Sequence, residues 1–201
     1  MRYYMTINEL KIRLRALLFA DIMLTPPEDD HLRLVNAGSE GELQWAIIDN
    51  GGGDRMWVYI KGESAVIKGF DHESELNQFA AEEWDSGFFD RVFEGMPAEL
   101  YSLFTEEERD ETTFCLWTTD GGNSWVEHPQ SRDNGKTWLM GYLFDSPEEL
   151  CRRAQEHYEA ELPLCFAKTL YTGGTPTAEE ILSVAPDRDA AQVLEEFAKA
   201  E

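Results

Sequence analysis

Apolar residues at the start of the chain recur at the spacing of an α-helix. The helical face that they predict carries Ile7, Leu10, Leu14 and Leu17. Thr6, followed by Glu9 three residues later, matches a capping box at the start of that helix. Residues 7–18 also alternate between apolar and polar positions, so a strand is the competing interpretation. We expect a helix that ends before Pro26.

The pattern then changes from helical spacing to strand-like runs. Three such runs cover 42–49, 55–61 and 64–70, separated by glycine-containing turns. In the second run, Trp57 and Tyr59 alternate with smaller apolar residues, as expected of a strand with two distinct faces. These runs predict an antiparallel meander of three strands.

Helical spacing returns in residues 71–93, which we expect to form a helix in one or two pieces. Its aromatic and aliphatic residues fall on one stripe, which would be buried and would leave the acidic residues on the opposite face. Gly95 and Pro97 end this pattern, and residues 97–104 predict a further short helical turn.

A second group of strand-like runs follows at 112–118, 124–128 and 136–144, again with turn residues between them. Helix signals close the chain. Ser146 is a good N-cap, Pro147 fits the first helical position, and Glu149 completes a capping box. Thr177 and Glu180 form another capping box. The last helices are expected at 178–184 and 188–199.

This order of elements predicts an α+β fold with two antiparallel β meanders, in one sheet or two, packed with helices and ending in C-terminal helices. The length of 201 residues suits a single domain over 1–201. Residues 164–201 are a candidate for a C-terminal helical appendage to it.

Charge separates the chain into two unequal parts. The formal net charge is −23. Residues 1–70 carry 10 acidic and 8 basic residues, whereas residues 71–111 carry 14 acidic and 2 basic residues. Such a field repels nucleic acid and anionic membranes and attracts basic partners. We therefore expect no nucleic-acid partner and no membrane partner, and we consider a basic protein as the partner.

The cysteines and the hydropathy indicate a cytoplasmic protein. Cys115, Cys151 and Cys165 are odd in number and widely spaced, which fits neither a disulfide framework nor a zinc site. We expect reduced thiols, with Cys115 in the core. No apolar run has the length of a membrane-spanning helix.

The motifs of catalysis and cofactor binding are incomplete. The run Gly51–Gly53 lies between two predicted strands, which favours a hairpin turn over a phosphate-binding loop. Gly135, Lys136 and Thr137 match only the tail of a P-loop. The histidines lack metal-site spacing. We assign no catalytic residue, no metal and no cofactor.

The densest group of reactive side chains is the run from Asp71 to Ser74. Neighbouring residues on a helix point in different directions, so this run cannot form a catalytic triad by itself. We expect Asp71 to cap a helix and Glu73 to lie in its first turn. If the run has a function, His72 and Glu73 are the side chains to test.

Trp117 and Trp125 flank the predicted turn at residues 120–123. Tryptophans at this position more often pair across strands and fill a core, with a recognition surface as the alternative. The acidic run 106–108 follows Thr105, which together with Glu108 predicts another capping box and a solvated helix face.

Two segments, WVYIKGESAVIKGFDHES and ETTFCLWTTDGG, resemble parts of uncharacterised α+β families of small acidic bacterial proteins found beside toxin genes. The size, acidity and α+β alternation of the chain resemble the same group. That resemblance implies an immunity-like role, in which a folded protein binds and blocks a toxin.

We therefore predict an acidic intracellular binding protein, an immunity- or antitoxin-type inhibitor of a basic protein, and we favour a non-enzymatic role. The alternatives are a small enzyme with a site assembled around His72, and a housekeeping protein whose acidity confers solubility. The sequence leaves the oligomeric state open. The predicted binding residues are Asp71, His72, Glu73, Glu75, Glu82, Glu83, Asp85, Asp90, Trp117 and Trp125.

Overall fold

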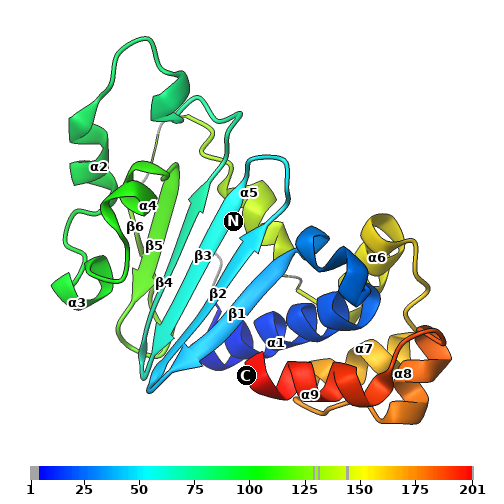
Figure 1. Ribbon diagram of the computed structural model, residues 1–201. Helices are drawn as coiled ribbons and strands as arrows, with labels where there is room; N and C mark the ends of the chain where they lie inside the picture. Colours follow the sequence, from blue (N-terminus) through cyan, green and yellow to red (C-terminus); the bar gives the residue numbers. More distant parts are fainter. Residues whose placement is uncertain (1–4, 129, 131, 144, 201) are drawn as a thin grey trace.

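The computed structural model describes residues 5–128, 130, 132–143 and 145–200. Within these residues the strands form one antiparallel sheet in which every strand lies beside its neighbour in the sequence (Figure 1). The predicted α+β fold is confirmed, and the two predicted meanders are parts of one sheet. The strands are β1 (Val35–Glu40), β2 (Leu43–Asp49), β3 (Arg55–Lys61), β4 (Ser64–Phe70), β5 (Phe114–Thr118) and β6 (Val126–Glu127).

Helices cover both faces of this sheet. The α-helices are α1 (Ile7–Leu24), α2 (Ser86–Val92), α3 (Ala98–Tyr101), α4 (Glu106–Asp110), α5 (Lys136–Leu139), α6 (Pro147–Tyr158), α7 (Leu164–Tyr171), α8 (Ala178–Val184) and α9 (Ala190–Ala200). Short 3₁₀ helices are η1 (Pro27–Leu32), η2 (Gln78–Ala80) and η3 (Met140–Tyr142). In Figure 1, α1 and α6–α9 lie at the β1 side of the sheet, whereas α2–α4 lie beside β4–β6.

The alternation of side chains along each strand divides the core in two. On β3, Val58 and Ile60 belong to the larger core beneath α1, and Trp57 belongs to the smaller core beneath α2–α4. On β5, Leu116 and Cys115 divide in the same way. Because both faces are covered, the central strands are apolar on both sides, which matches the buried Cys115 that the sequence predicts.

The long helix α1 organises the larger core. The predicted capping box forms, since the Thr6 side chain accepts from the Glu9 amide and the Glu9 side chain accepts from the Thr6 amide. The competing strand interpretation is therefore wrong. Phe19 packs against an aromatic ring of α7 and one of α9, with ring centroids 6.0 and 4.8 Å away. Residues 164–200 thus share the core of α1.

A buried lysine attaches α4 to the other face of the sheet. The Lys68 ammonium donates to the backbone carbonyls of Glu108 and Glu111. It lies 3.4 Å from the centroid of the Trp57 ring, and the Trp57 indole in turn donates to the Glu108 carboxylate at 3.1 Å. Burial lowers the pKa of Lys68 to about 7. The carbonyls at the end of a helix and an aromatic face are both favourable partners for such a cation.

One predicted element is wrong and two are shorter than predicted. Residues 71–93 form turns, η2 and α2 instead of a helix from residue 71. Residues 136–142 form α5 and η3 instead of a strand, while Phe144, the end of that predicted strand, lies outside the described residues. The predicted strand 124–128 shortens to β6, and β1 was not predicted at all.

The helix starts predicted after Ser146 and Thr177 are correct, whereas the last helix begins at Ala190 and not at residue 188. Ser146 accepts from the Glu149 amide at 3.3 Å, and the capping box of Thr177 with Glu180 is complete. The predicted capping box of Ser146 with Glu149 forms only by half, because the Glu149 side chain pairs with Arg152 at 2.6 Å. Across the described part of the chain, no helix combines the length and apolarity that crossing a bilayer requires.

Candidate functional site

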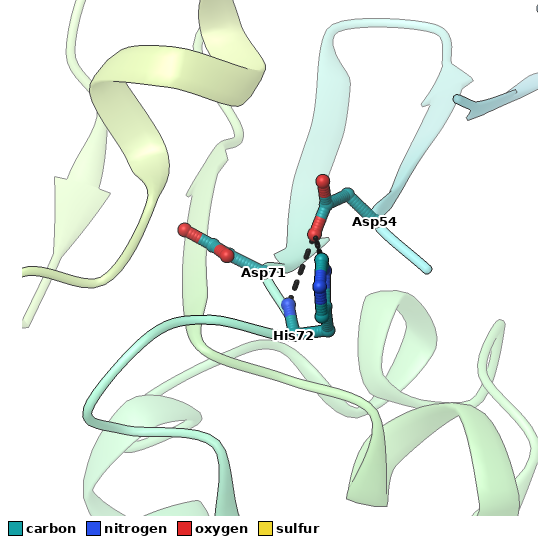
Figure 2. Close-up of side chains that lie close together, drawn as sticks. All are labelled: Asp54, Asp71 and His72. Atoms are coloured by element: carbon teal, nitrogen blue, oxygen red, sulfur yellow. Dashed lines mark hydrogen bonds and ion pairs between the residues drawn. The ribbon is translucent and has the colours of Figure 1, made fainter. Parts of the chain in front are cut away.

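A buried carboxylate and an exposed imidazole meet at one end of the sheet. Arg55 of β3 pairs with Phe70 of β4, so the residues just outside these two positions lie side by side. Asp54 Oδ1 accepts from the His72 amide at 3.0 Å and lies 2.7 Å from His72 Nδ1 (Figure 2). Asp54 Oδ2 accepts from the Asn50 amide group at 2.7 Å. The pair therefore joins the turn before β3 to the segment that leaves β4.

This contact shifts the pKa of both groups toward an ion pair. Burial raises the pKa of Asp54, but hydrogen bonds from the backbone and ring of His72 and from Asn50 outweigh burial, and the net pKa is lowered. The hydrogen bond with Asp54 raises the pKa of His72. The side chains are 7% and 44% exposed respectively. Asp54 thus favours the protonated form of His72, and the other ring nitrogen, Nε2, lies 4.0 Å from Glu73 Oε1.

Asp71 continues the cluster toward the loop before α5. Its backbone amide donates to Thr113 Oγ1 at 3.1 Å, and Thr113 Oγ1 donates to the Asn134 carbonyl at 2.8 Å. Its carboxylate accepts from the Glu73 amide at 2.9 Å, which forms a tight turn. Asp71 therefore stabilises a turn and not the helix start that the sequence predicts. Burial is the main cause that raises the pKa of Asp71.

The cluster brings together three groups that can bind a metal. One ligand atom each from Asp54, Asp71 and His72 lies within 4.8 Å of the others. A metal at Nδ1 of His72 would have to displace the hydrogen bond to Asp54 and compete with a proton that this bond stabilises. In Figure 2 the Asp71 carboxylate points away from the His72 ring. The geometry therefore favours an ion pair that attaches a segment over a metal centre.

Sequence reasoning identified Asp71 and His72 but missed Asp54. The predicted strands 55–61 and 64–70 contained the needed signal. In the hairpin that they form, the residue before the first strand lies beside the residues after the second. Asp54 directly follows the run Gly51–Gly53, which by itself indicates only a turn.

The segment that begins at this cluster exposes aromatic rings. We call residues 71–93 the acidic–aromatic segment. Phe79 is 59% exposed and Trp84 is 47% exposed. Their ring centroids lie 5.5 Å apart in an edge-to-face arrangement. Phe70 continues the row on one side at 6.0 Å, and Phe89 on the other at 5.4 Å. The expectation that all these aromatics are buried opposite the acids is therefore wrong for Phe79 and Trp84.

Acidic side chains surround the exposed rings in sequence. The segment contains seven acidic residues and a single basic residue, Arg91. Asp71 is half-buried, while six predicted binding residues are exposed: Glu73, Glu75, Glu82, Glu83, Asp85 and Asp90. Arg91 pairs with Asp85 at 2.6 Å. Within the described part of the chain, Glu82 and Glu83 make no ion pair. Exposed acids and exposed aromatics thus occupy the same stretch of backbone.

Both ends of the acidic–aromatic segment are attached to the body of the protein. Near its start, the His72 amide donates to Asp54 Oδ1 at 3.0 Å and Ser74 donates to the Asp133 carbonyl at 2.9 Å. At its end, Phe88 and Val92 are buried in the smaller core. Residues 79–86 between these attachments are exposed throughout. The exposed rings therefore sit on a loop with fixed ends.

The two predicted tryptophans do not form one surface. Trp117 is 3% exposed and lies in the smaller core, whereas Trp125 packs against the larger core on the opposite face of the sheet. The Trp125 indole donates to the Met5 carbonyl at 2.8 Å. Trp138, which is 43% exposed, lies on α5.

Comparison with known proteins found no matching protein-family model, no matching curated protein and no matching solved structure.

Proposed function

We propose that this chain is a binding protein for a basic protein partner, of the immunity or antitoxin type, and that the acidic–aromatic segment makes the contact. One observation carries the proposal: Phe79 and Trp84 are exposed side by side in a loop whose charged residues are almost all acidic. Adjacent exposed aromatics are unusual on a protein surface and are typical of interaction sites.

The two kinds of side chain would have different tasks in such a contact. Aromatic side chains at the centre of an interface contribute most of the affinity, and their loss mainly speeds dissociation. Charges around them steer the encounter and mainly affect the association rate. Glu82 and Glu83 directly precede Trp84 and are not paired with any described basic residue, so they are suited to steering.

The two alternatives from the sequence make different demands. A housekeeping role, in which the acids only confer solubility, gives no reason for an exposed aromatic pair among them. An enzyme built on His72 would need a substrate cavity and a second polar group that faces the imidazole. Among the described residues, the contacts of His72 are to Asp54, Glu73 and Asn77. These contacts attach the start of the acidic–aromatic segment to the body of the protein, which supports a binding role for the segment.

The test compares matched baits. Wild-type chain, the Glu82→Lys/Glu83→Lys variant and the Phe79→Ser/Trp84→Ser variant are immobilised and exposed to an extract of the native host, and retained proteins are identified. A retained protein is then purified and its association measured by surface plasmon resonance at low and high salt. We expect a basic protein whose association rate falls about tenfold with the charge reversal at low salt. The aromatic variant should weaken affinity about 30-fold or more.

The controls change the same properties elsewhere. Glu161→Lys/Asp187→Lys alters the net charge equally, and Leu32→Ser/Leu182→Ser removes two exposed apolar side chains outside the segment. Both should bind as wild type does. An acidic partner, or equal association of wild type and charge-reversed chain at low salt, would refute the proposal. The inhibitor type is tested separately, by whether an equimolar amount of the chain abolishes the toxicity of the purified partner.

A further inference from the structure

A hollow lies under the middle of α1, on the opposite face of the sheet from the acidic–aromatic segment. On this face Ala37 of β1 pairs with Ala46 of β2, which pairs with Val58 of β3. The next row places Gln44 beside Ile60. Two alanines side by side leave space that larger side chains would fill. The cavity measures about 270 Å³, just below the range of small-molecule sites, which begins at roughly 300 Å³.

The walls of the cavity are apolar and come from three separate parts of the chain. Leu14 and Leu18 of α1 form the side opposite the sheet. Ala200, at the end of α9, closes a further side. In Figure 1 the end of α9 lies close to α1 and the sheet. An alkyl chain is the kind of group that such walls bind, since burying its methylene groups is favourable.

One polar atom in the lining is buried without a hydrogen-bond partner among the described residues. Gln44 Oε1 is buried and, among the described residues, finds no hydrogen-bond donor. A buried acceptor without a donor costs free energy, and a bound molecule with a hydroxyl or amide hydrogen would recover that cost. Gln44 is the only amide side chain among the residues that line the cavity in the described structure.

The charges at the cavity are basic although the chain as a whole is acidic. Lys11 and Arg15 line it, one turn apart on α1. Arg15 is held in place by hydrogen bonds of 2.8 Å to the Gly174 carbonyl and 2.7 Å to Thr175 Oγ1. The Lys11 side chain is exposed and makes no ion pair within the described residues. An anionic group at this position would gain the attraction of both cations.

From these features we propose that the cavity binds the carboxylate form of a medium-chain hydroxy fatty acid. Its alkyl chain lies between Leu18 and Ala46, its hydroxyl donates to Gln44 Oε1 and its carboxylate pairs with Lys11. This site is independent of the proposed protein contact, because it uses α1 and the other face of the sheet.

Isothermal titration calorimetry of the full chain tests the site with three probes that share a ten-carbon chain: decanoate, 3-hydroxydecanoate and decyltrimethylammonium. We expect saturable binding of both carboxylates, with the hydroxy acid about five- to tenfold tighter, the gain of one hydrogen bond. The cationic probe should not bind. Failure of both carboxylates to bind, or equal binding of the cationic probe, would overturn the proposal.

Variants assign the parts of the ligand to residues. Gln44→Leu should abolish the preference for the hydroxy acid while decanoate still binds. Lys11→Glu should weaken both carboxylates about three- to fivefold, whereas the exposed Lys168→Glu on α7 should not. Ala46→Leu should abolish binding by filling the hollow, with Ala37→Leu as a second filling variant in a half-buried position. Undiminished binding by a folded filling variant would show that the ligand lies elsewhere.

Discussion

Asp54 and His72 give the start of the acidic–aromatic segment an attachment that depends on protonation. The buried carboxylate accepts two hydrogen bonds from one histidine, of which the ring bond strengthens when the imidazole is charged. The same histidine accepts from Asn77 through its carbonyl, so the attachment extends into the segment. Changes at His72 should therefore reach the loop that carries the exposed rings.

The first prediction follows from the raised pKa of His72. A group whose pKa is higher in the folded state adds stability below its unfolded pKa of about 6.5, and this stability is lost as the pH rises through the folded value. The melting temperature of wild type should therefore exceed that of His72→Gln most at pH 5 to 6. The difference should narrow as the pH rises toward 9. Thermal unfolding followed by circular dichroism over this range measures it.

A second histidine provides the control for this prediction. His31 is exposed on η1 and is not one of the three clustered residues, so His31→Gln should not reproduce the pH-dependent difference. Asp54→Asn should remove most of the pH dependence, because it removes the carboxylate that raises the pKa of His72. A wild-type advantage that stays constant from pH 5 to 9 would mean that the pair adds no charge-dependent stability.

At the level of single residues, local chemistry could be predicted and long-range contact could not. The capping roles of Thr6, Thr105 and Thr177 follow from the next three residues alone, and all three form. The Asp54–His72 pair needs the register of β3 and β4. The buried ammonium of Lys68 needs the position of α4, which no pattern near Lys68 contains.

At the level of the elements, β4 and β5 pack closely where a glycine of β4 lies against an aromatic ring of β5. Gly69 pairs with Phe114, and a Cβ at Gly69 would overlap the Phe114 ring. The ring covers the glycine and fills part of the larger core, where it is 1% exposed. This contact holds β5 against the strand from which the acidic–aromatic segment departs.

The second prediction is that Gly69→Ala lowers the free energy of unfolding by about 1–3 kcal/mol, because the buried ring must move to admit a methyl group. Urea denaturation followed by tryptophan fluorescence measures the loss. Gly141→Ala in η3 is the matched control, since a Cβ there meets no atom within 4 Å. The control should stay within about 0.5 kcal/mol of wild type. Equal stabilities for both variants would show that the sheet adjusts freely at Gly69.

The predictability of each element depended on whether its own residues decide it. The helix from Ile7 and the hairpins between residues 42 and 70 carry strong local signals and were predicted closely. β1 has a weak strand composition and exists because it pairs with β2. In the acidic–aromatic segment, Ser74 and Asn77 hydrogen-bond to nearby amides and stabilise turns, so a helical pattern of apolar residues did not produce a helix.

For the whole molecule, the asymmetry of charge has two opposite consequences. The nearly neutral first 70 residues supply α1 and the first meander, and the strongly acidic remainder supplies the exposed loop and most of the other helices. Like charges repel in the compact state, so a net charge of −23 opposes folding. The same field attracts a basic partner. Salt screens both the repulsion that opposes folding and the attraction of the partner, so added salt should stabilise the free chain and weaken the complex.

The third prediction is therefore that added sodium chloride stabilises the free chain. Between about 10 mM and about 1 M salt the Debye length falls from about 30 to about 3 Å, which screens repulsion between exposed acids. We expect the melting temperature to rise by about 3 °C, corresponding to roughly 1 kcal/mol for a domain of this size. The Glu82→Lys/Glu83→Lys variant carries less negative charge and should rise less. Calorimetry at several salt concentrations measures both. The same salt should slow association with a basic partner, so stabilisation of the free chain and weakening of the complex must occur together. A melting temperature that falls with added salt would contradict the prediction. It would mean that attractive ion pairs, such as Arg33 with Glu196, outweigh the repulsion between acids.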